Sequence, residues 1–419
     1  MGLVLCLVSL ALFCFSPDEL LPALAPYHPQ LVILLPAAAA SLISFTMQRT
    51  KLQTPQVYLV IGFWFAIVMS ALTKLWLRGS LEAFITFGTV VCIYFVVALN
   101  VTTTARLRLV CGALSFFAVI MSVMGIFAYH AGFMGETLLY ERMGEGFQIY
   151  KRVRALGTFN DPNDFSQFLA VALALLGVFW KKRNSLRNVL VLGPPAAILV
   201  YTIYLTGSRG AMFGLAAIIF VIVSKRFGPM QSAFFAGVVV LLMIAAQFGG
   251  GRDITLHEER VMTWGTGINM LKHNPIFGIG FQKFTEYSEM TAHNSFVLCF
   301  AELGTFGYFF WLALILTTVM SLNRFSKLSN HSPEGERRAR LVPPLRAALF
   351  AFLATAWFLS RTYNPILFVL VALIGALVNT PEEGEEKLEL TPSRWIPTTL
   401  AFQLVSVMMI YATIRLRSF

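Results

Sequence analysis

Long apolar segments recur along nearly the whole chain and are separated by short polar connections. A helix that crosses the hydrocarbon core of a bilayer needs about 20 apolar residues, within a range of roughly 17–25. Several of the segments are short, so we expect an all-α polytopic membrane protein with about 12 transmembrane helices in a single integral membrane domain, residues 1–419. The candidate spans are 1–16, 29–47, 57–76, 82–100, 109–129, 164–180, 189–206, 211–224, 231–248, 293–321, 346–361, 364–379 and 396–414.

The composition excludes a soluble protein. Hydrophobic residues make up 57% of the chain and charged residues only 13%, whereas a soluble domain has about 25% charged residues. Residues 1–15 lack a basic leader and a small-residue cleavage site, so we interpret them as a retained first helix. Cysteines lie only in apolar stretches and predict neither a disulfide framework nor a zinc site; they are Cys6, Cys14, Cys92, Cys111 and Cys299.

The net charge of +11 is concentrated in alternate connections. Basic residues cluster near positions 49–51, 106–108, 181–187, 225–226 and 324–346, while the long loop 130–163 is close to neutral. The positive-inside rule therefore puts the basic loops in the cytoplasm and the long loops 130–163 and 249–292 on the outer side. The basic balance reports membrane topology, so we expect no nucleic-acid partner.

The side of the C-terminus stays open at this point. Thirteen spans with a cytoplasmic N-terminus would leave Arg415 and Arg417 outside, against the charge rule. Either one weak segment does not cross fully, or the C-terminus is external. The weak segments are 1–16 and the 346–379 pair, which is interrupted at Tyr363-Asn364-Pro365.

The two outer loops carry recognisable helix signals. Asp161 followed by Pro162 predicts a helix start, with a capping carboxylate and then proline at the first helical position. In the larger loop, 249–292, an amphipathic stretch from Glu258 to Lys272 predicts a helix on which Arg260 and Trp264 share one face. Asn274-Pro275 should end this helix, and Gly278-Ile279-Gly280 predicts a flexible turn.

Ser208-Arg209-Gly210 stands at the mouth of an apolar helix. Ser208 can cap that helix, whose free backbone N–H groups and positive dipole end favour an anion. Arg209 adds a two-pronged cation that suits phosphate or diphosphate. An interfacial arginine that reaches the lipid headgroups is an equally good interpretation of the triplet alone.

His293 enters the next span at the same side, and Asn294 or Ser295 can cap that helix. A histidine here can take a proton from an incoming hydroxyl, because its pKa lies near working pH. Taken alone, an anchoring histidine at the interface is the more economical interpretation. Glu302 lies about 13 Å deeper on the opposite side of a continuous helix, so we interpret it as part of a structural network.

No zinc spacing, phosphate-cradling glycine loop or Asp-x-Asp metal motif occurs in the sequence. We therefore expect metal-independent acid–base and electrostatic chemistry without a cofactor.

The order of these motifs resembles that in the O-antigen ligase and polymerase superfamily of bacterial inner-membrane glycosyltransferases. The resemblance covers roughly residues 150–310. Its motifs are Arg154-x-x-Gly157-x-Phe159-x-x-Pro162-Asn163, Thr206-Gly207-Ser208-Arg209-Gly210, Arg260-x-x-x-Trp264, Asn274-Pro275-x-x-Gly278-x-Gly280, His293-Asn294-Ser295-Phe296 and Glu302-Leu303-Gly304-x-x-Gly307.

The resemblance implies an O-antigen ligase, a multi-pass protein of the bacterial inner membrane whose active site faces the periplasm. Such ligases move a glycan from undecaprenyl diphosphate to the lipid A–core oligosaccharide of lipopolysaccharide, and they are thought to invert the anomeric centre. We assign His293 as the general base, and Arg209 and Arg260 as the cations that stabilise the departing diphosphate. Further substrate-binding residues are expected at Arg154, Asn163, Ser208, Gly210, Trp264 and Asn294. Membrane lipids surround the helices, and the sequence leaves the oligomeric state open.

Three alternatives stay open. An O-antigen or exopolysaccharide polymerase of the same superfamily would share every motif. A transporter or flippase for lipid-linked sugars would show repeated halves and helices broken at the midplane, and we find no repeated halves in this sequence. A non-catalytic assembly protein is a third reading, which the intact arginine–histidine set weighs against.

Overall fold

The computed structural model describes residues 2–48, 54–143, 149–246, 248, 256–328, 333–379 and 390–417. Within these residues, nine helices are long and apolar enough to cross a membrane. Four shorter apolar helices, Gly2–Phe15, Gln56–Leu72, Arg209–Ser224 and Pro365–Val378, bring the total to thirteen segments, nine plus four. The expected all-α polytopic membrane fold is confirmed, and its segments match the candidate spans closely.

The chain forms two compact units. The first comprises Met1–Ile43, Leu99–Arg252 and Ser329–Thr355. Its helices are α1 (Gly2–Phe15), α2 (Pro17–Leu20), η1 (Pro22–Tyr27), α3 (Pro29–Gln48), α6 (Thr104–Ala131), α7 (Gly135–Leu138), η3 (Gly157–Phe159), α8 (Pro162–Leu176), η4 (Gly177–Phe179), α9 (Ser185–Thr206), α10 (Arg209–Ala245), α13 (Pro333–Ala339) and α14 (Val342–Ala356).

Helix α8 forms the centre of the first unit. It contacts α6, α9 and α10, and nearly all of its residues are buried, as expected of a helix that is apolar on all sides. Hydrogen bonds join it to two neighbouring helices. Gln167 Nε2 donates to Phe352 O (3.1 Å) and Thr355 Oγ1 (2.7 Å) of α14, and Ser115 Oγ of α6 donates to Ala172 O (3.1 Å). These bonds hold the middle of α8 against α14 and α6.

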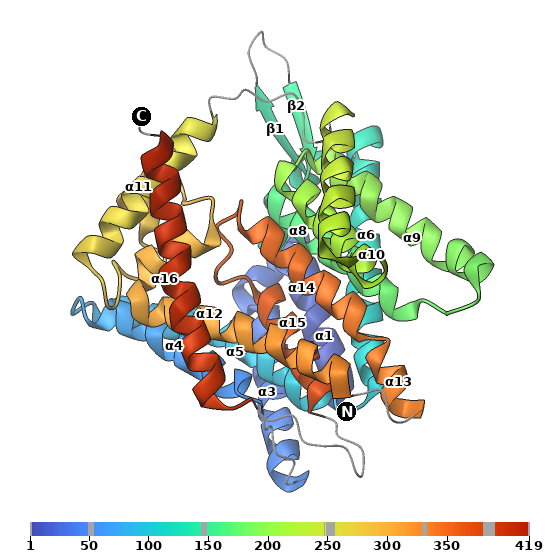
Figure 1. Ribbon diagram of the computed structural model, residues 1–419, viewed down its shortest axis with the longest axis horizontal. Coiled ribbons are helices and arrows are strands. Elements are labelled where there is room, and N and C mark those ends of the chain that lie inside the picture. The colour runs from blue at the N-terminus through green and yellow to red at the C-terminus, as the bar shows by residue number, and fades with distance from the viewer. Residues whose placement is uncertain are drawn as a thin grey trace. The chain divides into compact units, whose positions relative to one another are not determined.

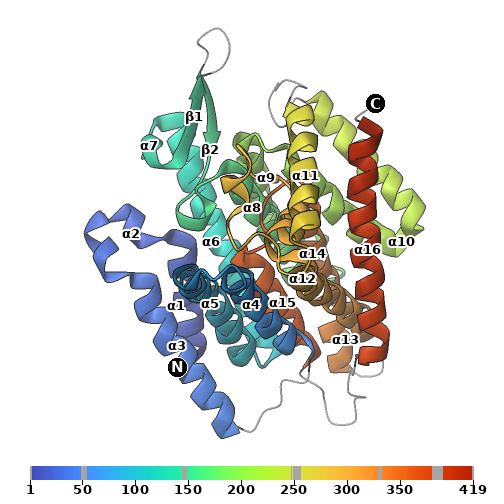
Figure 2. The same cartoon turned by 90° about the vertical axis from the view of Figure 1, so that its left-hand side faces the viewer.

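The loop 130–163 contains a β-hairpin that no local sequence pattern predicted (Figure 2). Strands β1 (Leu139–Met143) and β2 (Ile149–Val153) pair in an antiparallel register that sets Tyr140 opposite Arg152. Val153 is fully buried, and β2 contacts α6. Because side chains alternate along a strand, the hairpin presents Arg152 and Arg154 to the same face.

The second unit comprises Ser44–Ala98, Asp253–Leu328 and Ala356–Phe419. Its helices are α4 (Gln56–Leu72), α5 (Leu77–Asn100), α11 (Leu256–His273), η5 (Phe284–Glu286), α12 (Ser295–Leu328), α15 (Pro365–Val378) and α16 (Pro392–Arg417). Helix α12 contacts α4, α11, α15 and α16 (Figure 1). It is therefore the element on which this unit is built.

Helix α12 is broken at Gly304, where the backbone has φ 64° and ψ −166°. The segment 275–280 fills the break with its own backbone. Pro275 O and Ile276 O accept from the N–H groups of Thr305 (2.8 Å) and Phe306 (3.0 Å), while Gly280 N donates to Glu302 O (2.9 Å). The turn at 278–280, predicted to be flexible, is thus held by backbone hydrogen bonds. It also fits closely, because a Cβ at Gly278 would lie 2.3 Å from the Glu302 carbonyl.

The end of α16 lies beside α11. The two helices run next to each other in both views (Figures 1 and 2), and Lys272 Nζ of α11 lies 5.6 Å from the ring centroid of Tyr411. Helix α11 belongs to the loop 249–292, which was expected on the outer side. Of the two topologies left open by the sequence, this contact favours an external C-terminus.

Candidate functional site

The start of α10 carries the first predicted site residues. Helix α9 ends at Thr206, Gly207 reverses the chain in a left-handed conformation (φ 59°), and α10 begins at Arg209 as predicted. The prediction that the Ser208 side chain caps this helix is wrong, since Ser208 occupies the N-cap position without a side-chain hydrogen bond. Its hydroxyl is fully buried, and within the described residues it has no partner. The first N–H groups of α10 are therefore not taken up by that hydroxyl.

Arg152 holds this turn in place by hydrogen bonds. It was not among the predicted site residues. Its Nε donates to Thr206 O (2.6 Å), and its Nη2 donates to Asn163 Oδ1 (3.0 Å). The side chain is 8% exposed, so these are charge-assisted bonds in a buried setting. Arg152 links the hairpin, the start of α8 and the turn before Arg209. The alternation of Arg152 and Arg154 in the sequence was visible, but the hairpin that orients them was not.

The remaining predicted residues of the first unit fall into two groups. Arg154 donates to Thr137 O (3.0 Å) and Glu136 O (3.1 Å), so it braces the base of the hairpin. Asn163 lies beside Arg152, and the predicted cap is confirmed, because Asp161 Oδ1 accepts from Asn163 N (2.7 Å). Gly210 is buried in the first turn of α10 and Arg209 is half-buried. The structure thus brings Asn163, Arg152 and the Arg209 turn together, and it gives Arg154 a separate structural contact.

His293 has an unusual backbone conformation at the start of α12. Its φ of 46° lies in the left-handed region, which costs a non-glycine residue on the order of 1–3 kcal/mol and is typical of functional sites. Asn294 caps the helix as predicted, since its Oδ1 accepts from Phe296 N (2.9 Å) and Val297 N (3.2 Å). The cap and the strained backbone together fix where the imidazole leaves the chain.

Trp264 holds the residue before His293 in place. Its indole Nε1 donates to Ala292 O (3.0 Å), and its ring packs edge-on against Trp357, 6.1 Å between centroids. Arg260 lies one turn earlier on α11 and is half-buried. The predicted helix through Arg260 and Trp264 is confirmed. The side chains of Glu258 and Glu259, an alternative explanation for Arg260, lie outside the described residues.

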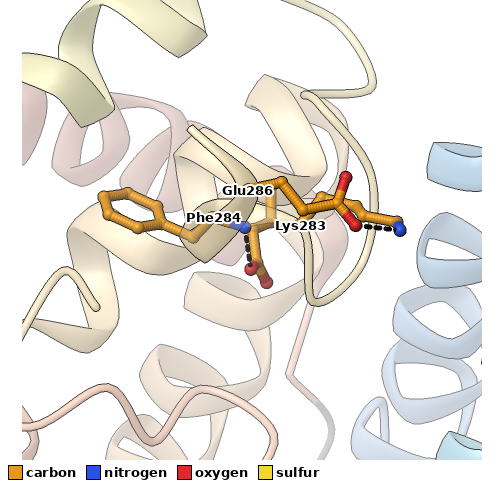
Figure 3. A network of polar contacts seen from close by, with 4 residues as sticks. Lys283, Phe284 and Glu286 are labelled. Atoms are coloured by element: carbon orange, nitrogen blue, oxygen red, sulfur yellow. Dashed lines mark hydrogen bonds and ion pairs between the residues drawn. The ribbon is translucent and has the colours of Figure 1, made fainter. Parts of the chain in front are cut away.

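Glu302 is the centre of a buried network, as predicted. Phe284 N donates to Glu302 Oε1 (3.0 Å; Figure 3), and Tyr363 OH donates to Oε2 (2.6 Å). Burial and the neighbouring Glu302 charge raise the pKa of the Tyr363 phenol well above its ordinary value, so the phenol stays a donor. Nearby, Lys283 pairs with Glu286 (Figure 3) and lies 3.9 Å from the Trp76 ring centroid. The carboxylate is thus committed to holding the loop 281–286 in place.

The predicted residues are distributed over the two units. Arg154, Asn163, Ser208, Arg209 and Gly210 belong to the first; Arg260, Trp264, His293 and Asn294 belong to the second. Each unit contributes a helix start with a cation or a histidine. That Arg209, Arg260 and His293 line one cavity stays a prediction.

In this chain of many apolar helices, an arginine opens one helix and a histidine precedes the start of another. Residues 194–312 match the family described as O-antigen ligase. The matched range covers the Arg209 turn, Arg260 and Trp264, and His293 with the first part of α12. This part of the chain is therefore similar to O-antigen ligases, a family of glycosyltransferase-like membrane enzymes. No curated protein sequence matches the chain.

Proposed function

We propose that this protein is an O-antigen ligase that transfers a glycan from undecaprenyl diphosphate to the lipid A–core oligosaccharide at the periplasmic face of the bacterial inner membrane. The observation that carries the proposal is the setting of His293. This histidine has a left-handed backbone, the preceding carbonyl is held by Trp264, and the following helix is capped by Asn294. A pre-positioned base of this kind suits proton removal from an acceptor hydroxyl.

In the proposed reaction the acceptor oxygen attacks the anomeric carbon of the donor sugar. A new C–O bond forms, the bond to the diphosphate oxygen breaks, and the acceptor proton moves to His293. Undecaprenyl diphosphate leaves with the bonding electron pair. Arg209 and Arg260 then stabilise the growing negative charge, which fixed cations do without a metal.

The role of Glu302 supports a single displacement with inversion. A retaining, double-displacement enzyme needs a second carboxylate as nucleophile, about 5–5.5 Å from the acid. The carboxylate nearest His293 in the sequence of α12 is Glu302, and it already accepts from Phe284 N and Tyr363 OH. A carboxylate with both oxygens bonded to the protein is poorly suited to attack a sugar.

The break in α12 does not favour a transporter. Discontinuous helices in transporters leave backbone groups open to ions and substrates. Here the carbonyls and N–H groups around Gly304 are paired with the segment 275–280 of the same chain. The break therefore serves to seat a loop.

The proposal is tested with purified protein in liposomes, a polyprenyl-diphosphate-linked glycan donor, and lipid A–core either present or absent. A product that forms only with lipid A–core supports a ligase, whereas a ladder from donor alone would make the protein a polymerase. His293→Ala should lower kcat by about 10²–10⁴-fold. The matched control is His273→Ala, because His273 is exposed on α11 and its ring bonds Asn269 O of the same helix. Wild-type transfer by His293→Ala at saturating acceptor would refute the base assignment.

A further inference from the structure

The connection between α14 and α15 is fastened to the helix start that follows His293. Ser295 Oγ donates to Leu359 O (2.6 Å) and accepts from Arg361 N (2.8 Å), and Thr362 Oγ1 donates to Ser295 O (2.7 Å). All three hydrogen bonds involve Ser295, which follows His293 by two residues in the sequence. They hold the backbone of Arg361 against the start of α12. Arg361 itself is half-buried, between the buried Leu359 and Thr362.

The same place has an excess of hydrogen-bond donors. Asn294 is fully buried, and while its Oδ1 caps α12, its Nδ2 has no partner within the described residues. The hydroxyl of Ser360, next to Arg361, is likewise buried and unpaired there. An unpaired buried donor costs about 1–3 kcal/mol, and a ligand with acceptor oxygens would recover that cost.

Neutral side chains cap both helices that start here. Helix α12 is capped by Asn294 and α15 by Asn364 Oδ1, which accepts from Ile366 N (2.9 Å). Both caps are neutral, whereas α8 of the first unit is capped by the carboxylate of Asp161. Neutral caps preserve the attraction of a helix start for anions.

We propose that Arg361 binds a phosphate group of a substrate on the His293 side of the transfer site, with the amide of Asn294 and the hydroxyl of Ser360 as further donors. This inference rests on the proposed function, because it names a substrate-binding residue for that reaction. Arginine is suited to the task, since its planar fork matches phosphate oxygens in pairs. Arg361 lies outside residues 194–312, so the family match does not point to it.

The test compares Arg361→Gln and Arg361→Lys with wild type in the liposome transfer assay, with donor and acceptor varied separately. Loss of a bidentate phosphate contact should lower kcat/KM about 10- to 100-fold in Arg361→Gln, and Arg361→Lys should recover part of it. A rise in donor KM assigns the phosphate to the lipid diphosphate. A rise in acceptor KM that disappears with dephosphorylated lipid A–core assigns it to the acceptor. Arg337→Gln is the control, because Arg337 is exposed on α13.

A second readout does not depend on transfer. Binding of radiolabelled undecaprenyl diphosphate, and separately of dephosphorylated and intact lipid A–core, is measured on protein in nanodiscs. Weaker binding of one phosphorylated lipid by Arg361→Gln supports the inference even if the wild type transfers no glycan, in which case only the proposed function fails. Wild-type values of Arg361→Gln for transfer and for both lipids would overturn the inference. An equal loss with phosphate-free lipids, or a melting temperature lowered in Arg361→Lys as much as in Arg361→Gln, would also overturn it by indicating a structural role.

Discussion

At the residue scale, Arg152 shows how a buried cation can hold a turn in place. Its guanidinium bonds the carbonyl of Thr206 and the side chain of Asn163, so it orients the turn from which Arg209 emerges. Removing the partner of a buried polar group destabilises the fold, because the group then loses its hydrogen bond without regaining water. Arg152 is therefore a positioning residue for the start of α10.

Arg152→Met should destabilise the fold and reduce transfer. The substitution removes charge-assisted bonds worth roughly 1.5–3 kcal/mol each and leaves the Thr206 carbonyl buried. Thermal unfolding in detergent measures the loss. The matched variant Arg154→Met removes bonds to Thr137 O and Glu136 O from a more exposed arginine and should cost less. Equal melting temperatures for the two variants would contradict this reading of Arg152.

At the scale of elements, the broken helix α12 and the segment 275–280 form one interlocked piece. Gly304 opens the helix, and the segment supplies the missing backbone partners. The fit leaves no room for side chains at the contact: a Cβ at Gly304 would lie 2.3 Å from Ile276 O, and one at Gly278 2.3 Å from Glu302 O. Because both obstacles are backbone atoms, neither can move aside without breaking the piece.

Gly304→Ala should therefore be costly. A positive φ destabilises alanine by on the order of 1–3 kcal/mol, and the added Cβ also clashes with Ile276 O. We expect a lower melting temperature and weaker transfer, since the segment leads into the loop fastened by Glu302. Gly237→Ala is the control, because a Cβ there meets nothing within 4 Å and alanine favours the helix. A Gly304→Ala protein as stable as Gly237→Ala would show that the interlock does not matter.

At the scale of the whole molecule, the sequence predicted the spans well and the long-range contacts poorly. A local run of apolar residues predicts each membrane-spanning helix, and capping residues such as Asp161 and Asn294 are local signals too. The hairpin, the insert at Gly304 and the bonds from Ser295 to residues 359–362 join segments that lie far apart in the chain. No local pattern encodes such pairings, so the bond from Arg152 to the turn before Arg209 and the bond from the Arg361 backbone to Ser295 could not be predicted from the sequence.

The side of the C-terminus gives a prediction for the chain as a whole. Positive charge at Arg415 and Arg417 would by itself keep the end of α16 in the cytoplasm. Yet α16 runs beside α11, with Tyr411 against Lys272. It is also bonded to α12: Gln403 Nε2 donates to Thr305 O (2.9 Å), and Tyr308 OH bonds Ser406 Oγ (2.8 Å). From these contacts with α11 and α12 we expect the end of α16 on the outer side, despite the two terminal charges.

A cysteine added after residue 417 should thus react with a membrane-impermeant maleimide from the same side as Glu289→Cys, in the outer loop, and from the opposite side to Glu336→Cys, in α13. Both reporter positions are exposed. The native cysteines lie within helices and are buried or half-buried, so their background labelling is low. Labelling of the terminal cysteine together with Glu336→Cys would place the end of α16 in the cytoplasm. The contact with α11 would then have to form below the outer surface, and one of the thirteen apolar segments would not cross the membrane.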